Sequence, residues 1–266
     1  MTSSVLASLP AALVRPDSAF SRAEVFRFPR ILIVLILFLL YVLGLRLAAG
    51  FDQNPYYKEL AATEVDARLG SFMANAPPEA QRQARDQAMS QILGDGSVVM
   101  TAISIVISAL AFLAVVMEMR LVCSVVTQFF GGQEERHGRE RPSLTLFLTA
   151  AVPLALRKFL EGLLLSFRNP EVSANAVSIK EYRALSAVRF DLFSFLPRMG
   201  LPAFFDYLLR LVTDPFFIWT AAVLVLGGRA IFRVSLKGAV GQAVVLLLVL
   251  CLQFALLSRI GFGMEL

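Results

Sequence analysis

The stretch Thr213–Lys237, TDPFFIWTAAVLVLGGRAIFRVSLK, decides how the rest of the chain is interpreted. Asp214 stands directly before Pro215, which is typical of a helix start, because a carboxylate caps free amides and proline is favoured at a first helical position. An apolar run continues to Gly228, and three cations at helical spacing close the stretch: Arg229, Arg233 and Lys237. An apolar run with a basic cluster at one end indicates a transmembrane helix whose cytoplasmic end carries the cluster.

The composition of the whole chain supports a membrane protein. Its 266 residues are 57% hydrophobic, with a mean hydropathy of +0.69. Charged residues make up only 17%, below the roughly 25% of soluble domains. We interpret the net charge of +5 as a topology signal and expect no nucleic-acid partner. The two cysteines, Cys123 and Cys251, lie in apolar runs and are expected to pack as small hydrophobic residues.

Five apolar stretches are long enough to cross a bilayer, and they predict an all-α integral membrane protein. The predicted spans are residues 31–51, 97–130, 143–167, 213–232 and 239–258. The second is longer than one crossing needs, since about 34 residues rise ~51 Å against a hydrocarbon core of ~30 Å. In the third span, Pro153 predicts a kink.

Two further segments are predicted to lie outside the hydrocarbon core. Residues 52–96 are polar and acidic, and they predict an extra-membrane helical hairpin between spans one and two. Residues 201–211 are amphipathic, with Asp206 and Arg210 one helical turn apart, and they predict an interfacial helix before span four. We treat residues 1–266 as a single membrane domain.

Basic residues predict the orientation of the spans. Residues 1–30 and the 229–237 loop are the clearly basic segments, and an even number of predicted spans separates them. Because Lys and Arg collect on the cytoplasmic side, both segments are placed there. The amino terminus is therefore predicted to lie inside and the carboxyl terminus outside.

Charges near or within the spans are the candidate functional residues, since a charge at the bilayer centre costs roughly 2.5–3.5 kcal/mol and needs protein, water or an interface beside it. The candidate polar cluster comprises Glu118, Arg120, Arg157, Lys158, Glu161, Asp206, Arg210, Asp214 and Trp219.

Two interpretations of this cluster stay open. It is either a polar pocket or pathway between spans two, three and four, or a set of structural ion pairs and snorkelling charges. We expect Glu118 to lie near Arg157 or Lys158, and Arg120 near Glu161. Trp219 is expected either to anchor the helix at the interface or to pack beneath the cluster.

No motif in the chain indicates catalysis. The chain has one histidine, His137, in a charged loop, where a solvated side chain is the ordinary interpretation. The sequence contains neither a phosphate-binding glycine loop nor a dinucleotide fingerprint, and it lacks a His-Glu-x-x-His zinc motif. We therefore expect no enzyme activity, no catalytic residue, no cofactor and no bound metal.

The motif Asp214-x-Phe216-x-x-Trp219, with Gly227 and a basic turn carrying Ser235 and Lys237 after it, resembles the corresponding segment of the Ypt-interacting (Yip) membrane-protein family. Three other features agree with that resemblance: the Pro16–Phe20 lead-in, Gly131-Gly132 after the second span, and Pro153 in the third. The order of five spans, with the amino terminus inside, is also similar.

The resemblance carries expectations about partners and location. Eukaryotic members of the family bind prenylated Rab GTPases, mostly through long cytosolic amino-terminal regions. Here only residues 1–30 precede the first predicted span, so we do not expect Rab binding. The short tail and the large outer hairpin resemble the bacterial branch, which implies the bacterial cytoplasmic (inner) membrane.

Two classes of function follow from these expectations. The first is a non-catalytic membrane scaffold or adaptor that acts through its helix surfaces and outer hairpin, with membrane lipid and other membrane proteins or a second copy of itself as partners. The second is a transport component that moves a lipid or small solute through the charged pocket.

Overall fold

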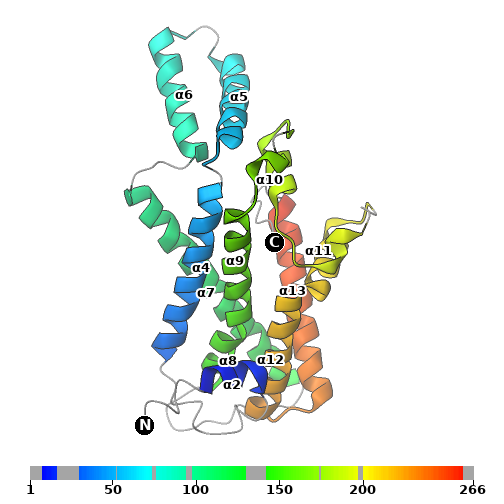
Figure 1. Ribbon diagram of the computed structural model, residues 1–266. Helices are drawn as coiled ribbons and strands as arrows, with labels where there is room; N and C mark the ends of the chain where they lie inside the picture. Colours follow the sequence, from blue (N-terminus) through cyan, green and yellow to red (C-terminus); the bar gives the residue numbers. More distant parts are fainter. Residues whose placement is uncertain are drawn as a thin grey trace. The chain divides into compact units, whose positions relative to one another are not determined.

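The computed structural model describes residues 8–16, 30–51, 53–73, 76–93, 98–129, 142–173, 175–196 and 200–259. Every regular element within these ranges is helical, which confirms the predicted all-α class (Figure 1). The α-helices are α2 Ser8–Val14, α4 Arg30–Phe51, α5 Pro55–Phe72, α6 Pro78–Leu93, α7 Val98–Phe129, α8 Pro142–Ala150, α9 Val152–Ser166, α10 Ile179–Ser186, α11 Ala203–Thr213, α12 Pro215–Phe232 and α13 Leu236–Arg259. Two 3-10 turns, η2 Pro170–Ser173 and η3 Leu192–Phe195, complete the set in the described ranges. Residues 17–20, Gly131, Gly132 and His137 lie outside them.

Helices occupy each of the five predicted spans. Three helical segments of the described chain are long and apolar enough to cross a membrane: Arg30–Phe51, Ser143–Ser166 and Pro215–Phe232. In α13 the apolar part is the shorter segment Leu236–Val249. The five-span topology itself stays a prediction.

The helix ends differ by a few residues from the approximate limits predicted for the spans, and the caps explain the differences. Thr213 belongs to the preceding helix α11, so α12 begins at Pro215. The fifth helix begins at Leu236, three residues early, because the Ser235 hydroxyl accepts a hydrogen bond from the Gly238 amide at 3.2 Å. The interfacial segment begins later than predicted, since Pro202 stands at the N-cap of α11.

The third predicted span is interrupted near its proline. Helix α8 ends at Ala150 and α9 begins at Val152, with a turn at Ala151. Pro153 has no amide hydrogen and its ring crowds the carbonyl four residues earlier, at Thr149. The backbone bonds from Ala151 to Phe147 (3.0 Å) and from Ala155 to Ala151 (3.1 Å) persist across the break. The helix is therefore disturbed where the sequence predicted a kink, and it resumes within one turn.

The chain divides into two compact units. The first unit comprises Met1–Leu39, Phe112–Arg157 and Phe190–Leu266. The second comprises Leu40–Ala111 and Lys158–Arg189. Helices α4, α7 and α9 contribute residues to both units, and each unit is described separately below.

The first unit is organised around α12. This helix contacts α8, α11 and α13, and α2 contacts α8. Figure 1 shows α12 and α13 side by side. One face of α12 is buried at helical spacing, which includes Phe217, Thr220, Val223, Leu224, Gly227, Gly228 and Ile231. Arg233 ends the helix with a left-handed φ of 52°, a conformation that often terminates helices.

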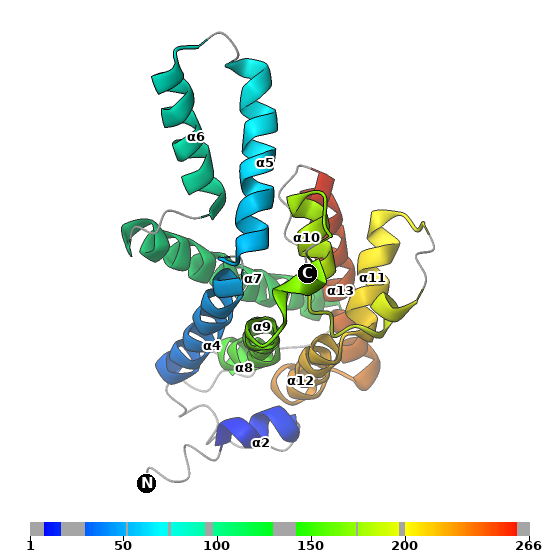
Figure 2. The same ribbon diagram turned by 45° about the horizontal axis from the view of Figure 1, so that its top comes forward.

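The second unit contains the α5–α6 hairpin, whose two helices lie side by side in Figures 1 and 2. Both helices were predicted in residues 52–96. Arg85 binds both carboxylate oxygens of Asp66, at 2.7 and 3.0 Å, and this pair links α6 to α5. The hydrogen bond that Arg85 donates to Asp66, together with the negative charge of that carboxylate, raises the pKa of Arg85.

Two glycines let α4 and α9 approach at backbone distance within the second unit. A Cβ atom placed on Gly162 would lie 2.1 Å from the Gly44 carbonyl oxygen, and one on Gly44 would lie 2.4 Å from the Lys158 carbonyl oxygen. Both distances are far below van der Waals contact. Small residues at such crossings are characteristic of membrane helices, because packing rather than hydrophobicity drives their association.

Candidate functional site

Asp214 stands at the junction of two helices and serves both of them. It is the C-cap of α11 and the N-cap of α12. Its Oδ1 atom accepts hydrogen bonds from the Phe216 amide at 2.8 Å and the Phe217 amide at 3.3 Å. The predicted capping role of Asp214 is thereby confirmed. A carboxylate at this position also lies at the positive end of the α12 dipole.

The second carboxylate oxygen of Asp214 binds a cation from another helix. The Nε atom of Arg157, on α9, donates to Oδ2 at 2.7 Å. The side chains of Arg157 and Asp214 are 15% and 7% exposed, so the pair is shielded from solvent. The two oxygens of one carboxylate thus satisfy a helix start and neutralise a charge in a predicted span. We name these two residues the Arg157–Asp214 pair.

Aromatic rings surround this pair. The guanidinium carbon of Arg157 lies 5.8 Å from the centroid of the Phe190 ring, within the range of cation–π attraction. The Phe190 ring meets the Phe216 ring edge-on, with centroids 5.2 Å apart. Apolar rings beside an ion pair lower the local dielectric and strengthen the attraction between its charges.

A capped turn holds Phe190 in place beside the pair. Asp191, which is buried, accepts hydrogen bonds from the Ser194 amide at 2.8 Å and from the Ser194 hydroxyl, and it thereby caps η3. The amide of Phe193 donates to the Thr213 hydroxyl at 3.3 Å, next to Asp214. Sequence reasoning missed Asp191 as a member of the site. Its signal was an aspartate three residues before a serine, a common local capping pattern.

Two other ion pairs of the polar cluster each lie on a single helix. Lys158 donates to Glu161 at 3.0 Å, three residues along α9. Arg210 donates to Asp206 at 2.8 Å on α11, which confirms the predicted spacing of one turn. Each pair neutralises two charges on one helix.

Glu118 and Arg120 lie on α7, and both are partly buried. Glu118 also interacts with another group of the protein, through a hydrogen bond or electrostatically. Their expected contacts with the third span, Glu118 with Arg157 or Lys158 and Arg120 with Glu161, stay predictions. The bond described above gives Arg157 a partner on α12, which the sequence analysis did not anticipate.

Trp219 connects α12 to the amino-terminal helix. Its indole Nε1 donates to the backbone carbonyl of Leu13 at 2.9 Å. Leu13 is the penultimate residue of α2, and carbonyls at a helix end have no partner within their own helix. Trp219 therefore fastens the end of α2 to α12. This contact was not among the roles expected from the sequence, because nothing in the local sequence links positions 206 residues apart.

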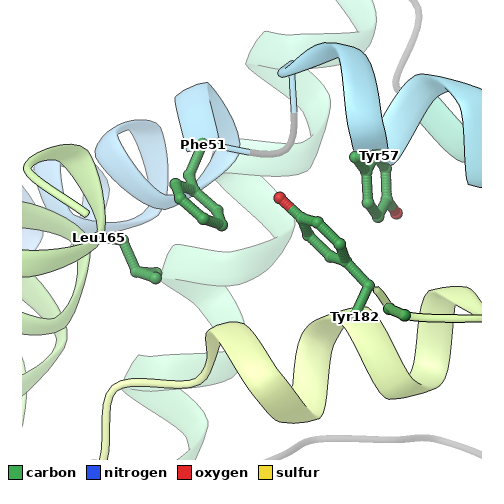
Figure 3. Packing of buried hydrophobic residues seen from close by; sticks show 5 residues of the cluster. Phe51, Tyr57, Leu165 and Tyr182 are labelled. Carbon is green, nitrogen blue, oxygen red and sulfur yellow. The ribbon is translucent and has the colours of Figure 1, made fainter. Parts of the chain in front are cut away.

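A second buried cluster, missed by sequence reasoning, lies in the second unit around Tyr182 of α10. Figure 3 shows its ring between Phe51 and Tyr57, with centroids 6.0 and 5.2 Å away. Its hydroxyl is hydrogen-bonded to the Asn54 side-chain amide, and Asn54 in turn caps α5 through the Tyr57 amide at 3.0 Å. The Asn54-Pro55 dipeptide is a helix-start signal in the sequence, whereas nothing local indicates Tyr182 as its partner.

Two arginines complete this cluster. Arg183 donates to the Tyr57 hydroxyl at 2.9 Å. Arg168 donates to the carbonyls of Leu185 and Ser186, each at 3.0 Å, and so satisfies the carboxyl end of α10. Helix α10 is short, so many of its backbone groups have no hydrogen-bond partner within the helix. The bonds from Arg168 give partners to the carbonyls at its carboxyl end.

The first cluster consists of a charge pair at a capped helix start, and the second consists of packed rings and hydrogen bonds at helix ends. In the part of the chain that the structure describes, there is no group of three or more His, Cys, Asp or Glu side chains that could hold a metal ion. Arg157 and Asp214 neutralise each other's charge, and the pair therefore stabilises the contact between α9 and the start of α12.

Together, the helical fold, the three helical segments able to cross a membrane and the shielded ion pair define an all-helical integral membrane protein. A comparison with protein-family models matches the Yip1 domain over residues 11–257, and the chain belongs to this family. The resemblance found in the sequence is thereby confirmed. No curated protein and no solved structure matches the chain.

Proposed function

We propose that this protein is a non-catalytic scaffold or adaptor of the bacterial cytoplasmic membrane. It has five spans, with the amino terminus inside and the carboxyl terminus outside. The α5–α6 hairpin lies outside the membrane, and α11 lies at the interface before the fourth span. The protein acts through its helix surfaces within the lipid and through the hairpin outside it, and both contact other membrane proteins or a second copy of this chain.

One observation carries this proposal: charges of the polar cluster are paired with each other. The three bonds join Arg157 to Asp214, Lys158 to Glu161, and Arg210 to Asp206. A transport pathway needs charges that face water or a solute, whereas a static scaffold needs its intramembrane charges neutralised. The pairing favours the scaffold.

The exposed surfaces fit the same role. The outer side of the hairpin is polar, with exposed residues that include Arg82, Gln83, Asp86 and Gln87 on α6. Helix α7 exposes a row of apolar side chains, which includes Ile103, Ile107 and Leu110. The first surface suits contacts in water and the second suits lipid or another membrane helix.

Site-specific photo-crosslinking in native membranes tests the proposal. A photoreactive phenylalanine analogue is placed at Gln83 or Gln87 on the hairpin and at Ile107 on α7, with Val177, an exposed loop residue, as the control. We expect a discrete adduct with an identified membrane protein or a second copy, from the hairpin or α7 but not from Val177. The scaffold is contradicted if neither surface yields an adduct, or if adducts form equally at the control.

The predicted orientation has its own test. In a chain with Cys123→Ala and Cys251→Ala, single cysteines replace Ser235 and Val177, which are both exposed. A membrane-impermeant maleimide applied to whole spheroplasts should label position 177 and spare position 235. Labelling of both positions from outside would overturn the five-span topology.

The alternative is a transport component that moves a lipid or small solute between spans two, three and four. One observation favours it: the Thr220 hydroxyl on α12 is buried and finds no hydrogen-bond partner among the described residues. In proteoliposomes, a transporter of lipid would speed the transfer of fluorescent phosphatidylcholine between leaflets, and Thr220→Val would slow that transfer. The scaffold predicts the same transfer rate with and without protein.

A further inference from the structure

The turn η3 and the start of α11 expose a group of large apolar side chains in the first unit. Leu192, Phe195 and Leu196 are 69%, 78% and 51% exposed. Leu201 and Phe205 continue the group at the beginning of α11, and η3 contacts α11. We name these five residues the apolar tip. Single exposed apolar side chains are ordinary, whereas a group such as this marks a surface that meets lipid or another protein.

The fold holds the apolar tip in a fixed conformation. Asp191 caps η3, and the amide of Phe193 donates to the Thr213 hydroxyl at the end of α11. The bond between Ser194 and Asp191 and the bond between Phe193 and Thr213 therefore brace a four-residue turn whose own helical bonds are few.

Continuity with the membrane helices identifies what covers the tip. Only Asp214 separates α11 from α12, a helix long and apolar enough to cross the membrane. Helix α11 also contacts α13. Exposed apolar residues continue from α11 onto α12 through Val212 and Ile218. The exposed apolar residues of the tip are therefore followed along the chain by exposed apolar residues on a helix that is able to cross the membrane.

The charges of α11 fit the same surroundings. Asp206 and Arg210 neutralise each other at 2.8 Å, and both are only partly exposed. A paired charge costs less near the hydrocarbon boundary than an isolated one. The tip itself carries no charged residue among its five members.

We propose, resting on the interfacial position of α11 in the proposed function, that the apolar tip inserts into the membrane leaflet at the amino-terminal end of α12, and that its partner is the lipid boundary between headgroups and acyl chains. The segment therefore works as an in-plane anchor, with aromatic and aliphatic side chains in the leaflet and its backbone braced by the protein.

Depth-dependent quenching tests this proposal. In the full chain with Cys123→Ala and Cys251→Ala, Phe195→Cys or Leu192→Cys carries an environment-sensitive fluorophore. The labelled protein is reconstituted into phosphatidylcholine vesicles with a nitroxide at an early position of the acyl chain, or with iodide in the water. Ile218→Cys on α12 is the lipid-exposed control, and Val177→Cys is the water-exposed control.

We expect positions 192 and 195 to behave like 218: lipid nitroxide quenches them several-fold more than it quenches 177, and iodide quenches them several-fold less. The proposal is overturned if iodide quenches both tip positions as strongly as 177. It is equally overturned if neither quencher reaches them, since a protein partner or a second copy would then cover the tip. The second labelling site keeps the test decisive if one variant fails to fold.

Discussion

Arg157 and Asp214 are 57 positions apart in the chain and meet through a 2.7 Å bond between Nε and Oδ2. The same carboxylate caps α12 with its other oxygen. The Asp214 side chain thus links the start of α12 to α9. Its charge and its capping oxygen have different partners, so the effect of each can be tested with a different substitution.

The charge can be removed without losing the cap. Asp214→Asn keeps an oxygen that accepts from the Phe216 amide but leaves Arg157 without its counter-charge, whereas Asp214→Leu removes both. We expect Asp214→Leu to destabilise the protein by about 1 kcal/mol more than Asp214→Asn, which is the typical worth of an N-cap. Thermal unfolding in detergent measures this. Equal melting temperatures for both variants and the wild type would rule out a capping role.

Removal of either partner of the Arg157–Asp214 pair should be costly. Arg157→Ala leaves a shielded carboxylate uncompensated, and breaking such a pair costs roughly 3–5 kcal/mol. The double variant Arg157→Ala, Asp214→Ala should lose far less than the sum of the single losses. The matched control is Arg210→Ala, which breaks a more exposed pair and should cost about 1 kcal/mol or less. Additive losses at Arg157 and Asp214 would show that the two side chains are not coupled.

The close contact of α4 and α9 at Gly44 and Gly162 should not tolerate an added methyl group. Gly162→Ala would bring Cβ to 2.1 Å from the Gly44 carbonyl oxygen, so the helices must separate. Overpacking typically costs about 1–3 kcal/mol, and a clash with rigid backbone should reach or exceed that range. Gly50→Ala on the same α4 meets nothing within 4 Å and should be neutral or slightly stabilising. A Gly162→Ala protein that melts like Gly50→Ala would contradict the crossing.

Tyr182 should hold α10 against α5 through both its ring and its hydroxyl. Tyr182→Phe removes the bond to Asn54 and should cost about 1 kcal/mol, whereas Tyr182→Ala empties a fully buried site and should cost about 3–5 kcal/mol. Hydrogen exchange of the α5 and α10 amides measures the effect locally. Val177→Ala, a change at an exposed neighbour, should leave that exchange unaltered. Unchanged exchange in Tyr182→Ala would remove the residue from the core of the second unit.

The indole of Trp219 should control the attachment of α2. Trp219→Phe keeps a large ring but loses the donor to the Leu13 carbonyl. We expect amide exchange across α2 to rise several-fold in Trp219→Phe. The control is a cysteine in place of Val14, which is exposed and should react with maleimide at a similar rate in both proteins. If α2 exchanges equally in both proteins, the hydrogen bond does not fasten the helix.

The family, the helical class and the cap at Asp214 were predictable from the sequence. The family depends on a short motif around Asp214, the helical class on runs of apolar residues, and the cap on neighbours within one turn, and all three are visible along the chain. The Asp206–Arg210 pair was predictable for the same reason, since its spacing alone brings the two side chains together.

Only the tertiary structure decided which distant residues meet. From sequence spacing we expected Arg157 or Lys158 to lie near Glu118 on the second span. In the structure, the rotation of α9 and the position of α12 place Arg157 beside Asp214. The Trp219–Leu13 contact, the Gly44–Gly162 crossing and the position of Tyr182 between Phe51 and Tyr57 are of the same kind. Apolar periodicity tells which residues of a helix avoid water. It carries no information on helix rotation or crossing angle, which the packing of the whole chain determines.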